Sequence, residues 1–281
     1  MAVQKRRGMA SSRQPLSAVA IGMLFLSLLG CGTNVPKGNT DPSKGVVVPT
    51  AETLQETDAR RRARLRLELG TSYYQQRQFA VALEETKQAL LMDPSYADSY
   101  SVMGLILMDL GDRRQAEDYF QRGLARDAQH SDLNLNYGWF LCQNGREKEA
   151  IERFLVVARN PLYAAPVKPL QNAGICALRM GDRLNAERYF LAGYETDPNS
   201  AVVLYQLANL NYLRQDLTKA RFYVNRLHSI YDPNAQTLWL NLKIERLAGN
   251  RDAEKSMADQ LRQRFPVSRE TESLNKGAYD E

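Results

Sequence analysis

Histidine and cysteine are scarce in this chain of 281 residues, which contains two histidines and three cysteines. So few ligands argue against a multi-ligand metal site. The phosphate-binding pattern G-x-x-x-x-G-K-S/T, the nucleophile motif G-x-S-x-G and the zinc motif H-E-x-x-H are also absent. His130 and His228 are expected to be surface or capping residues, because no nucleophile or carboxylate partner accompanies them. We therefore predict no enzyme, no metal, no cofactor and no small-molecule substrate.

Acidic residues are missing before Asp41, and this absence explains the net charge of +5. Four positive charges lie in the N-terminal segment 1–30, at Lys5, Arg6, Arg7 and Arg13. Without that segment the formal charge is +5 − 4 = +1. The basic balance is therefore a targeting feature and does not indicate a nucleic-acid-binding surface. We predict no nucleic-acid partner.

An apolar run of 14 residues, from Leu16 to Leu29, follows this basic stretch. A helix needs about 20 apolar residues to span a bilayer, so the run is typical of a secretory signal. It ends in Leu28-Leu29-Gly30-Cys31, which resembles a bacterial lipobox, where the cysteine thiol carries diacylglycerol. We predict a lipoprotein signal peptide over residues 1–30 and acylation of Cys31. An ordinary signal peptide followed by a chance cysteine is the alternative.

The residues after Cys31 predict where the protein is held. Gly32 stands where an aspartate would indicate retention in the inner membrane, so the lipoprotein resemblance implies a lipid anchor on the periplasmic face of the outer membrane. The stretch up to Thr50 is rich in Gly, Pro, Asn, Thr and Ser. Such a composition cannot bury enough apolar surface to order itself. We predict that residues 31–50 form a flexible tether reaching about 25 Å.

Small residues recur at regular intervals in the rest of the chain. Five alanines stand at nearly equal spacing: Ala82, Ala116, Ala150, Ala186 and Ala220. Twelve residues before the first four stand Gly70, Gly104, Gly138 and Gly174, and four residues after three of them stand Phe120, Phe154 and Phe190. Amphipathic helices alone do not impose such a period, which is that of the tetratricopeptide repeat (TPR), about 34 residues. The sequence therefore predicts an all-α TPR solenoid, a right-handed superhelix of about six helix–turn–helix repeats within residues 51–266.

The predicted repeats run over residues 63–96, 97–130, 131–166, 167–200, 201–234 and 235–266. Each has a helix A and a helix B, usually joined by a glycine where a positive φ is needed. The last two repeats are degenerate, since Gln215 replaces the turn glycine and Leu242 replaces the small residue of helix A. Residues 267–281 are expected to be a polar, frayed tail.

Helix A of each repeat is expected to face a concave groove, and several groove positions are apolar or aromatic. These candidate partner-binding residues are Tyr74, Leu105, Met108, Leu135, Trp139, Ile175, Leu178, Tyr205, Tyr212 and Trp239. Such a groove suits an extended or helical segment of another protein. The alternative is that tight curvature buries the same side chains in the core.

Cys142 and Cys176 lie near the ends of helix A in the third and fourth repeats. The two positions point to nearly opposite sides of a helix, so on neighbouring, roughly parallel helices they can face each other, at heights that differ by about 3 Å. A periplasmic location would allow oxidation, so we predict a disulfide between them. Two separate buried thiols are the alternative.

Two segments around these cysteines are more specific than the repeat itself. They are Asn134-Leu-Asn-Tyr-Gly-Trp-Phe-Leu-Cys142 and Asn172-Ala-Gly-Ile-Cys176, with Pro161-Leu162-Tyr163 between them. Together with the lipobox, the tether and six repeats, they resemble the PilF/PilW group of type IV pilus biogenesis lipoproteins over nearly the whole chain. The resemblance implies a pilotin, a protein that assists the pilus secretin to reach the outer membrane and multimerise. A lipoprotein of outer-membrane barrel assembly and an adaptor for peptidoglycan enzymes are the alternatives.

Overall fold

The structure is a computed structural model that describes residues 56–279, which form thirteen α-helices and no strand. The helices are α1 (Asp58–Gln75), α2 (Phe79–Met92), α3 (Ala97–Asp109), α4 (Arg113–Leu124), α5 (Ser131–Gln143), α6 (Glu147–Ala158), α7 (Val167–Arg179), α8 (Arg183–Thr196), α9 (Ala201–Leu213), α10 (Leu217–Ile230), α11 (Ala235–Leu247), α12 (Arg251–Arg264) and α13 (Arg269–Lys276). The predicted signal peptide, Cys31 and the tether lie outside the described residues.

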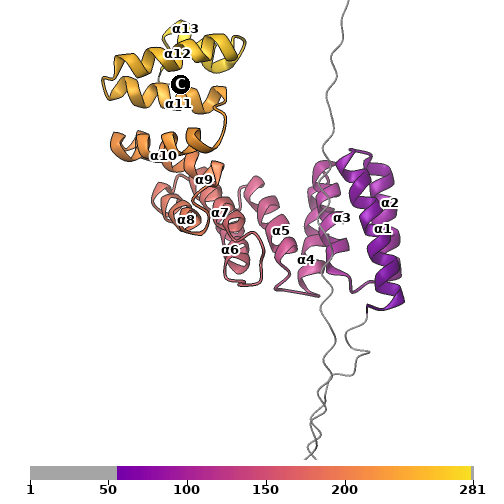
Figure 1. Cartoon of the computed structure of the whole chain (residues 1–281). Helices are drawn as coiled ribbons and strands as arrows, with labels where there is room; N and C mark the ends of the chain where they lie inside the picture. The colour runs from indigo at the N-terminus through magenta and orange to yellow at the C-terminus, as the bar shows by residue number, and fades with distance from the viewer. Residues whose placement is uncertain (1–55, 280–281) are drawn as a thin grey trace, which may run out of the picture. The chain divides into compact units, whose positions relative to one another are not determined.

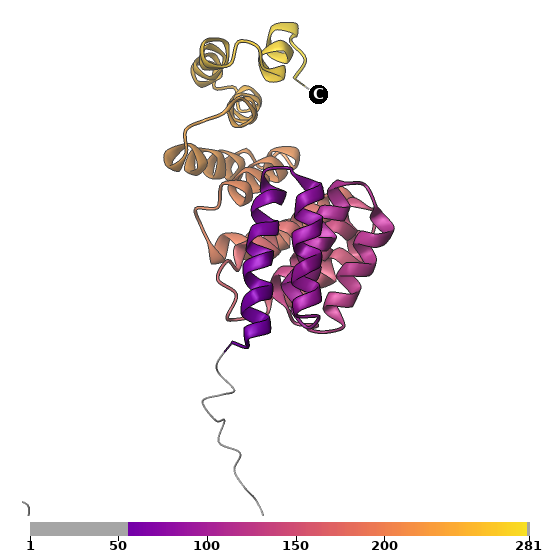
Figure 2. The ribbon, with the colours of Figure 1, turned by 90° about the vertical axis from the view of Figure 1, so that its right-hand side faces the viewer.

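Consecutive helices pack as pairs, and each pair packs on the next, so the described part is the all-α TPR solenoid expected from the sequence (Figures 1 and 2). Helices α3, α5, α7, α9 and α11 begin at the first residues of predicted repeats two to six. The first repeat differs, because α1 begins at Asp58 instead of residue 63, where Thr57 caps it by accepting a hydrogen bond from the Arg60 N–H. Among the described helices, none combines the length and apolarity needed to cross a bilayer.

The turns between helix A and helix B have a common chemistry. Gly111, Gly145, Gly181 and Gly249 all have positive φ. Arg77 and Gln215 occupy the equivalent positions with φ of 59° and 63°, a conformation that costs a non-glycine residue energy. In three of these turns the next residue is an aspartate that caps helix B: Asp112, Asp182 and Asp216.

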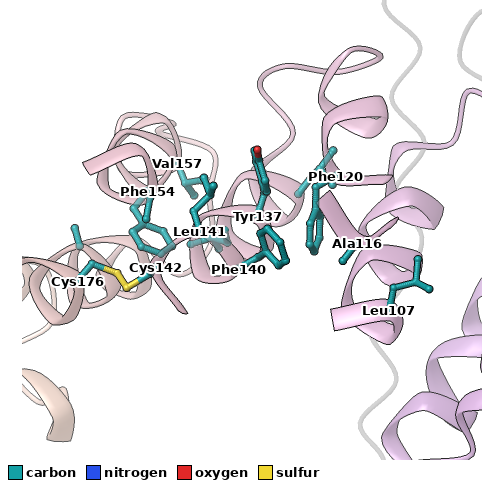
Figure 3. Packing of buried hydrophobic residues seen from close by; sticks show 14 of the residues in the cluster. Leu107, Ala116, Phe120, Tyr137, Phe140, Leu141, Cys142, Phe154, Val157 and Cys176 are labelled. Carbon is teal, nitrogen blue, oxygen red and sulfur yellow. A yellow bond between two sulfur atoms is a disulfide. The ribbon is translucent and has the colours of Figure 1, made fainter. Parts of the chain in front are cut away.

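Within repeats two to four, helix A and helix B meet at a glycine–phenylalanine contact. A Cβ atom at Gly104, Gly138 or Gly174 would lie within 2.7 Å of a ring carbon of the phenylalanine sixteen residues later. The three phenylalanine rings are fully buried, and that of Phe120 also reaches the next repeat. Phe120 lies 5.5 Å from Tyr137 and 5.7 Å from Phe140, measured between ring centroids (Figure 3). One ring thus fills the space within a repeat and between repeats.

The degenerate repeats fill the same space with other pairs of residues. In the fifth repeat Ala208 replaces the glycine and Val224 replaces the larger phenylalanine, and both are fully buried. In the sixth repeat the sizes are exchanged, since Leu242 lies on helix A and Ala258 on helix B, in one hydrophobic cluster. In the sixth repeat the larger side chain therefore lies on helix A instead of helix B. Cores tolerate such exchanges well when the total side-chain volume is similar.

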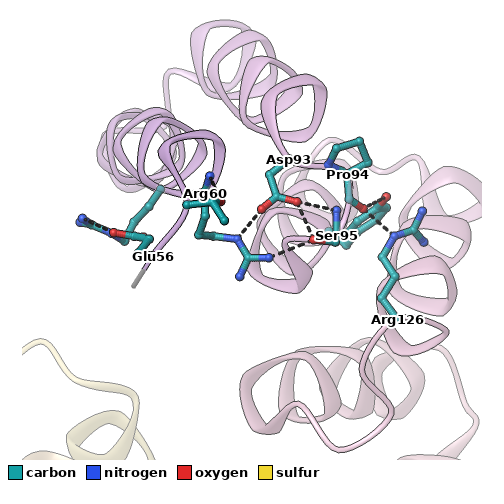
Figure 4. Close-up of polar contacts among 9 residues, drawn as sticks. Glu56, Arg60, Asp93, Pro94, Ser95 and Arg126 are labelled. Carbon is teal, nitrogen blue, oxygen red and sulfur yellow. Dashed lines mark hydrogen bonds and ion pairs between the residues drawn. The ribbon is translucent and has the colours of Figure 1, made fainter. Parts of the chain in front are cut away.

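Asp-Pro pairs follow three of the B helices. The first pair, Asp93-Pro94, makes hydrogen bonds at the junction of repeats one and two (Figure 4). Helix α2 ends at Met92, and the Asp93 carboxylate accepts hydrogen bonds from Ser95 and from the Arg60 guanidinium. The carbonyl of Pro94 accepts from Arg126, 2.7 Å away. The loop therefore ties α1, α3 and the end of α4 together.

The prediction of a frayed C-terminal tail is wrong for part of that segment. Residues 269–276 form α13 instead of a frayed tail. Ser268 caps the helix, Thr271 and Leu274 are buried, and the Thr271 hydroxyl donates to the carbonyl of Phe265, 2.7 Å away. Tertiary packing orders this short helix, which its own composition would not stabilise in isolation.

Candidate functional site

The ten predicted groove residues all lie on A helices, from Tyr74 on α1 to Trp239 on α11. Eight of them are half-buried, so part of each side chain is accessible. Leu135 and Trp239 are the exceptions, with exposed fractions of 3% and 7%. These two residues belong to the interior and cannot act as open anchors, which corrects their predicted role.

The middle of the groove combines core and surface character. Leu105, Met108 and Trp139 pack with part of their side chains against the buried cluster around Phe120 and Phe154. Ile175 and Leu178 pack in the same way against the next cluster. Each of these side chains is therefore partly buried in the core and partly accessible in the groove. The accessible parts form an apolar surface on α3, α5 and α7.

Cys142 and Cys176 form a disulfide that joins α5 to α7, with their Cα atoms 5.9 Å apart (Figure 3). Both residues are buried in the same cluster as Phe154. The bond links the helices that carry Trp139 and Ile175 and therefore fixes the spacing of two predicted groove residues.

The N-terminal end of the groove is polar, and the sequence reasoning missed it. A cleft of about 510 Å³ runs over α1, α3 and α5, and its charged residues are Arg64, Glu68, Asp98 and Asp132. Arg64 donates to Glu68, 2.8 Å away. Asp98 and Asp132 occupy the second position of helix A, and reading that position along the repeats would have indicated a polar end.

His130 connects the second and third repeats beside this cleft. Its Nδ1 accepts a hydrogen bond from the Leu133 N–H, which makes it the cap of α5 and agrees with the expected capping role. Its Nε2 lies 3.2 Å from an oxygen of Asp98. The hydrogen bond that His130 donates to the Asp98 carboxylate raises the pKa of His130 and lowers the pKa of Asp98.

A second cleft, of about 480 Å³, lies between α9, α10 and α11, and Tyr205 and Tyr231 line it. Burial raises the pKa of the Tyr205 hydroxyl, which is consistent with its half-buried position. His228 also lines this cleft, and its Nε2 is buried without a hydrogen-bond partner. Burial lowers the pKa of His228, so the expected surface or capping role is wrong for this histidine.

The C-terminal end of the groove is covered by the chain itself. Tyr279 stacks on Trp239 with ring centroids 5.5 Å apart. Lys243 and Arg246 flank the pair, and Arg246 is bound to Glu254, whose carboxylate also accepts from Arg251. Burial favours the neutral form of Glu254, but these hydrogen bonds outweigh it and lower its pKa. The carboxylate is therefore ionised at neutral pH.

No group of three or more His, Cys, Asp or Glu side chains within residues 56–279 is arranged to hold a metal ion. The described groove instead consists of an apolar middle between a polar and a cationic end. Such a surface can bind a protein segment through apolar contacts and select it through charge.

Known proteins with similar sequences or structures share this architecture. Residues 101–164 match the family model of the tetratricopeptide repeat. The type IV pilus assembly protein PilF of Pseudomonas aeruginosa is 27% identical over 253 residues, which are 90% of this chain and 95% of that protein. Its solved structure has a TM-score of 0.71 at 25% identity and covers 79% of this chain and 100% of that one. The structure of PilW, a widely conserved type IV pilus biogenesis factor, has a TM-score of 0.68 at 26% identity, over 76% of this chain and 98% of that one.

Proposed function

The chain is homologous to PilF and PilW, the TPR proteins of type IV pilus biogenesis, and from this premise we propose that it is a pilotin for the pilus secretin. In this role it is a non-enzymatic scaffold that assists the secretin to reach the outer membrane and multimerise. The observation that carries the proposal is the apolar middle of the groove, formed by half-buried side chains on α3, α5 and α7.

The first part of the proposal concerns the lipid anchor, which would determine where the protein is located. We propose that Cys31 is acylated and holds the protein on the periplasmic face of the outer membrane, with the following residues as a tether. Two or more acyl chains are sufficient for stable anchoring. Mass spectrometry of the mature N-terminus tests this part. The expected N-terminal residue is lipid-modified Cys31, and an unmodified Cys31 or cleavage at another residue contradicts it.

The second part of the proposal is that the groove contacts the secretin. A secretin segment lying across α3, α5 and α7 would bury the accessible parts of Met108, Trp139 and Ile175. Desolvated aromatic residues carry much of the energy of such interfaces. The disulfide between α5 and α7 preorganises this surface, so less entropy is lost on binding.

The experiment that tests the contact compares Trp139→Ala with Phe222→Ala. Phe222 is an aromatic residue on a B helix with an exposed fraction of 54%, which makes it a matched control outside the groove. Trp139→Ala is expected to cost about 2 kcal/mol of binding, about thirtyfold, and to reduce detergent-resistant secretin multimers and surface pili. Tyr205→Ala tests the adjoining part of the groove in the same way.

Circular dichroism of each variant verifies the fold, since Trp139 also packs against the core. Wild-type levels of secretin multimers with a folded Trp139→Ala protein contradict the groove. A pull-down of the wild-type lipoprotein from envelope extracts tests the partner separately. Barrel-assembly proteins or peptidoglycan hydrolases in place of secretin would contradict the pilotin role.

A further inference from the structure

The cleft between α9, α10 and α11 shares Tyr205 with the predicted groove and has an apolar lining. Its volume is about 480 Å³, and Val202, Leu227 and Tyr231 form part of its wall. Leu227 is buried, whereas Val202 and Tyr231 have exposed fractions of 38% and 44%. The cleft is therefore apolar both in its interior and at its rim, as is typical of a pocket that receives a side chain of another molecule.

A buried ring nitrogen without a partner belongs to this lining. His228 lines the cleft, and its Nδ1 lies 3.5 Å from the amide nitrogen of Asn241. The other ring nitrogen, Nε2, is buried and has no hydrogen-bond partner. A buried polar atom without a partner is costly, because it has lost its bond to water and gained none in return. A ligand with a polar group at Nε2 would remove this cost.

The charges around the cleft favour a neutral ligand. Its lining contains no lysine or arginine and one carboxylate, that of Asp232. Burial, with a smaller contribution from the charge of Glu270 on α13, raises the pKa of Tyr205, so a second carboxylate also acts on the cleft. An anionic ligand would be repelled, and a cation would have to lose its hydration beside the neutral His228, whose pKa is lowered by burial. A main-chain peptide group is neutral and offers both a donor and an acceptor, so it can pair with Nε2 in either tautomer of the histidine.

Hydrogen bonds hold the rim of the cleft in place. The Tyr231 hydroxyl donates to the carbonyl of Asn199, 2.9 Å away, at the start of the fifth repeat. On the other side, Asn234 and Thr237 cap α11 through reciprocal hydrogen bonds. A cleft whose walls are already fixed loses less entropy when a ligand binds.

We infer that this cleft is a specificity pocket for a large apolar residue in an uncharged stretch of a partner segment. The apolar side chain lies against Leu227 and Tyr231, and the main-chain peptide group beside it binds Nε2 of His228. The inference goes beyond the pilotin role, because it holds whichever protein supplies the segment.

The experiment is an NMR titration of the whole mature protein labelled with ¹⁵N-histidine. His130 and His228 are the two histidines of the chain, so His130 is an internal control. The probe is acetyl-Ala-Phe-Ala-amide, which has one large apolar side chain and no charge. We expect it to shift the Nε2 signal of His228 saturably and to leave the signals of His130 unchanged. Peptides with glycine, aspartate or lysine in place of the phenylalanine are expected to bind at least tenfold more weakly.

Two variants with a matched position identify the site. Val202 lies in the first turn of α9 and Val81 in the first turn of α2, with exposed fractions of 38% and 40%. Val202→Glu places a charge at the rim of the cleft and is expected to weaken binding of the phenylalanine peptide at least fivefold, whereas Val81→Glu should leave it unchanged.

Three results would overturn the inference. They are an unmoved His228 signal, equal binding of the aspartate or the lysine peptide, and no effect of Val202→Glu. Secretin multimers are not part of this readout, so its failure is distinct from a failure of the pilotin role.

Discussion

Repeats two to four and repeats five to six solve one packing problem in two ways. In the first group, a glycine on helix A contacts a phenylalanine of helix B, and in the second repeat that ring also contacts the following repeat. In the second group, Ala208 meets Val224 and Leu242 meets Ala258. The comparison shows that the fold does not require one residue type on either side of this contact between the helices.

The two regions also differ at the groove. The middle repeats carry half-buried apolar side chains and the disulfide between α5 and α7. The last repeat has its tryptophan covered by Tyr279 and its cations around an open cleft. The middle repeats thus give an accessible apolar surface, whereas the sixth repeat gives a covered and charged one.

Removal of the disulfide should have the largest effect on the middle repeats. The bond joins residues 34 positions apart in the sequence, and for a loop of this length the chain-entropy model gives roughly 4 kcal/mol of stabilisation. Reduction with dithiothreitol, or Cys142→Ala with Cys176→Ala, should lower the melting temperature markedly. Thiol counting on denatured, unreduced mature protein should find neither cysteine free. Two reactive thiols would refute the bond.

A second prediction converts one kind of repeat into the other. Gly138→Ala places a Cβ atom 2.7 Å from a carbon of the Phe154 ring, so the helices must separate, at a cost of about 2 kcal/mol. Adding Phe154→Val recreates the alanine–valine pair of the fifth repeat. The double variant should be more stable than the sum of the two single changes predicts, by about 0.5 kcal/mol or more, as measured by urea denaturation. If the effects of the two changes on the free energy of unfolding were strictly additive, the alanine–valine pair would not compensate for the lost glycine–phenylalanine pair.

The turn of the fifth repeat gives a smaller effect of opposite sign. Gln215 has a positive φ where three of the preceding turns have glycine. Gln215→Gly should therefore stabilise the protein by about 1 kcal/mol, measured as a shift in the urea midpoint. Gly145→Ala is the matched reverse change and should destabilise it. An unchanged or lower midpoint for Gln215→Gly would show that the turn is not strained.

The smallest effect concerns pH and the junction of repeats two and three. Asp98, with Asp127 and Asp132 nearby, raises the pKa of His130, so the folded protein holds this proton more tightly than the unfolded chain does. The stabilisation is complete below the ordinary pKa near 6.5 and is lost as the pH rises through the raised value. The cap bond to Nδ1, which is lost on protonation, is long at 3.3 Å.

Melting temperatures of wild type and His130→Gln should therefore differ most near pH 5.5 and converge above pH 8. The difference should stay below about 1 kcal/mol, because the pair is only partly buried. A difference that grows with pH would contradict the assignment.

The sequence allowed the repeat boundaries to be predicted because alanine, glycine and phenylalanine recur where two helices approach closely. It also indicated the partners Cys142 and Cys176, since regular helices fix their directions. It did not predict α13, because only Thr271 and Leu274 of this polar helix are buried, and their burial depends on the preceding helices. The covering of Trp239 depends in the same way on a single tyrosine far along the chain, which no periodic pattern marks.

Photo-cross-linking in cells tests whether the secretin lies on the apolar middle of the groove. A benzoylphenylalanine at Met108, a half-buried groove residue on α3, is compared with one at Leu184, whose exposed fraction on the B helix α8 is 70%. We expect an adduct with the pilus secretin from Met108 and none from Leu184. Equal adducts from the two positions, or none from Met108 in a folded, membrane-bound protein, would contradict it.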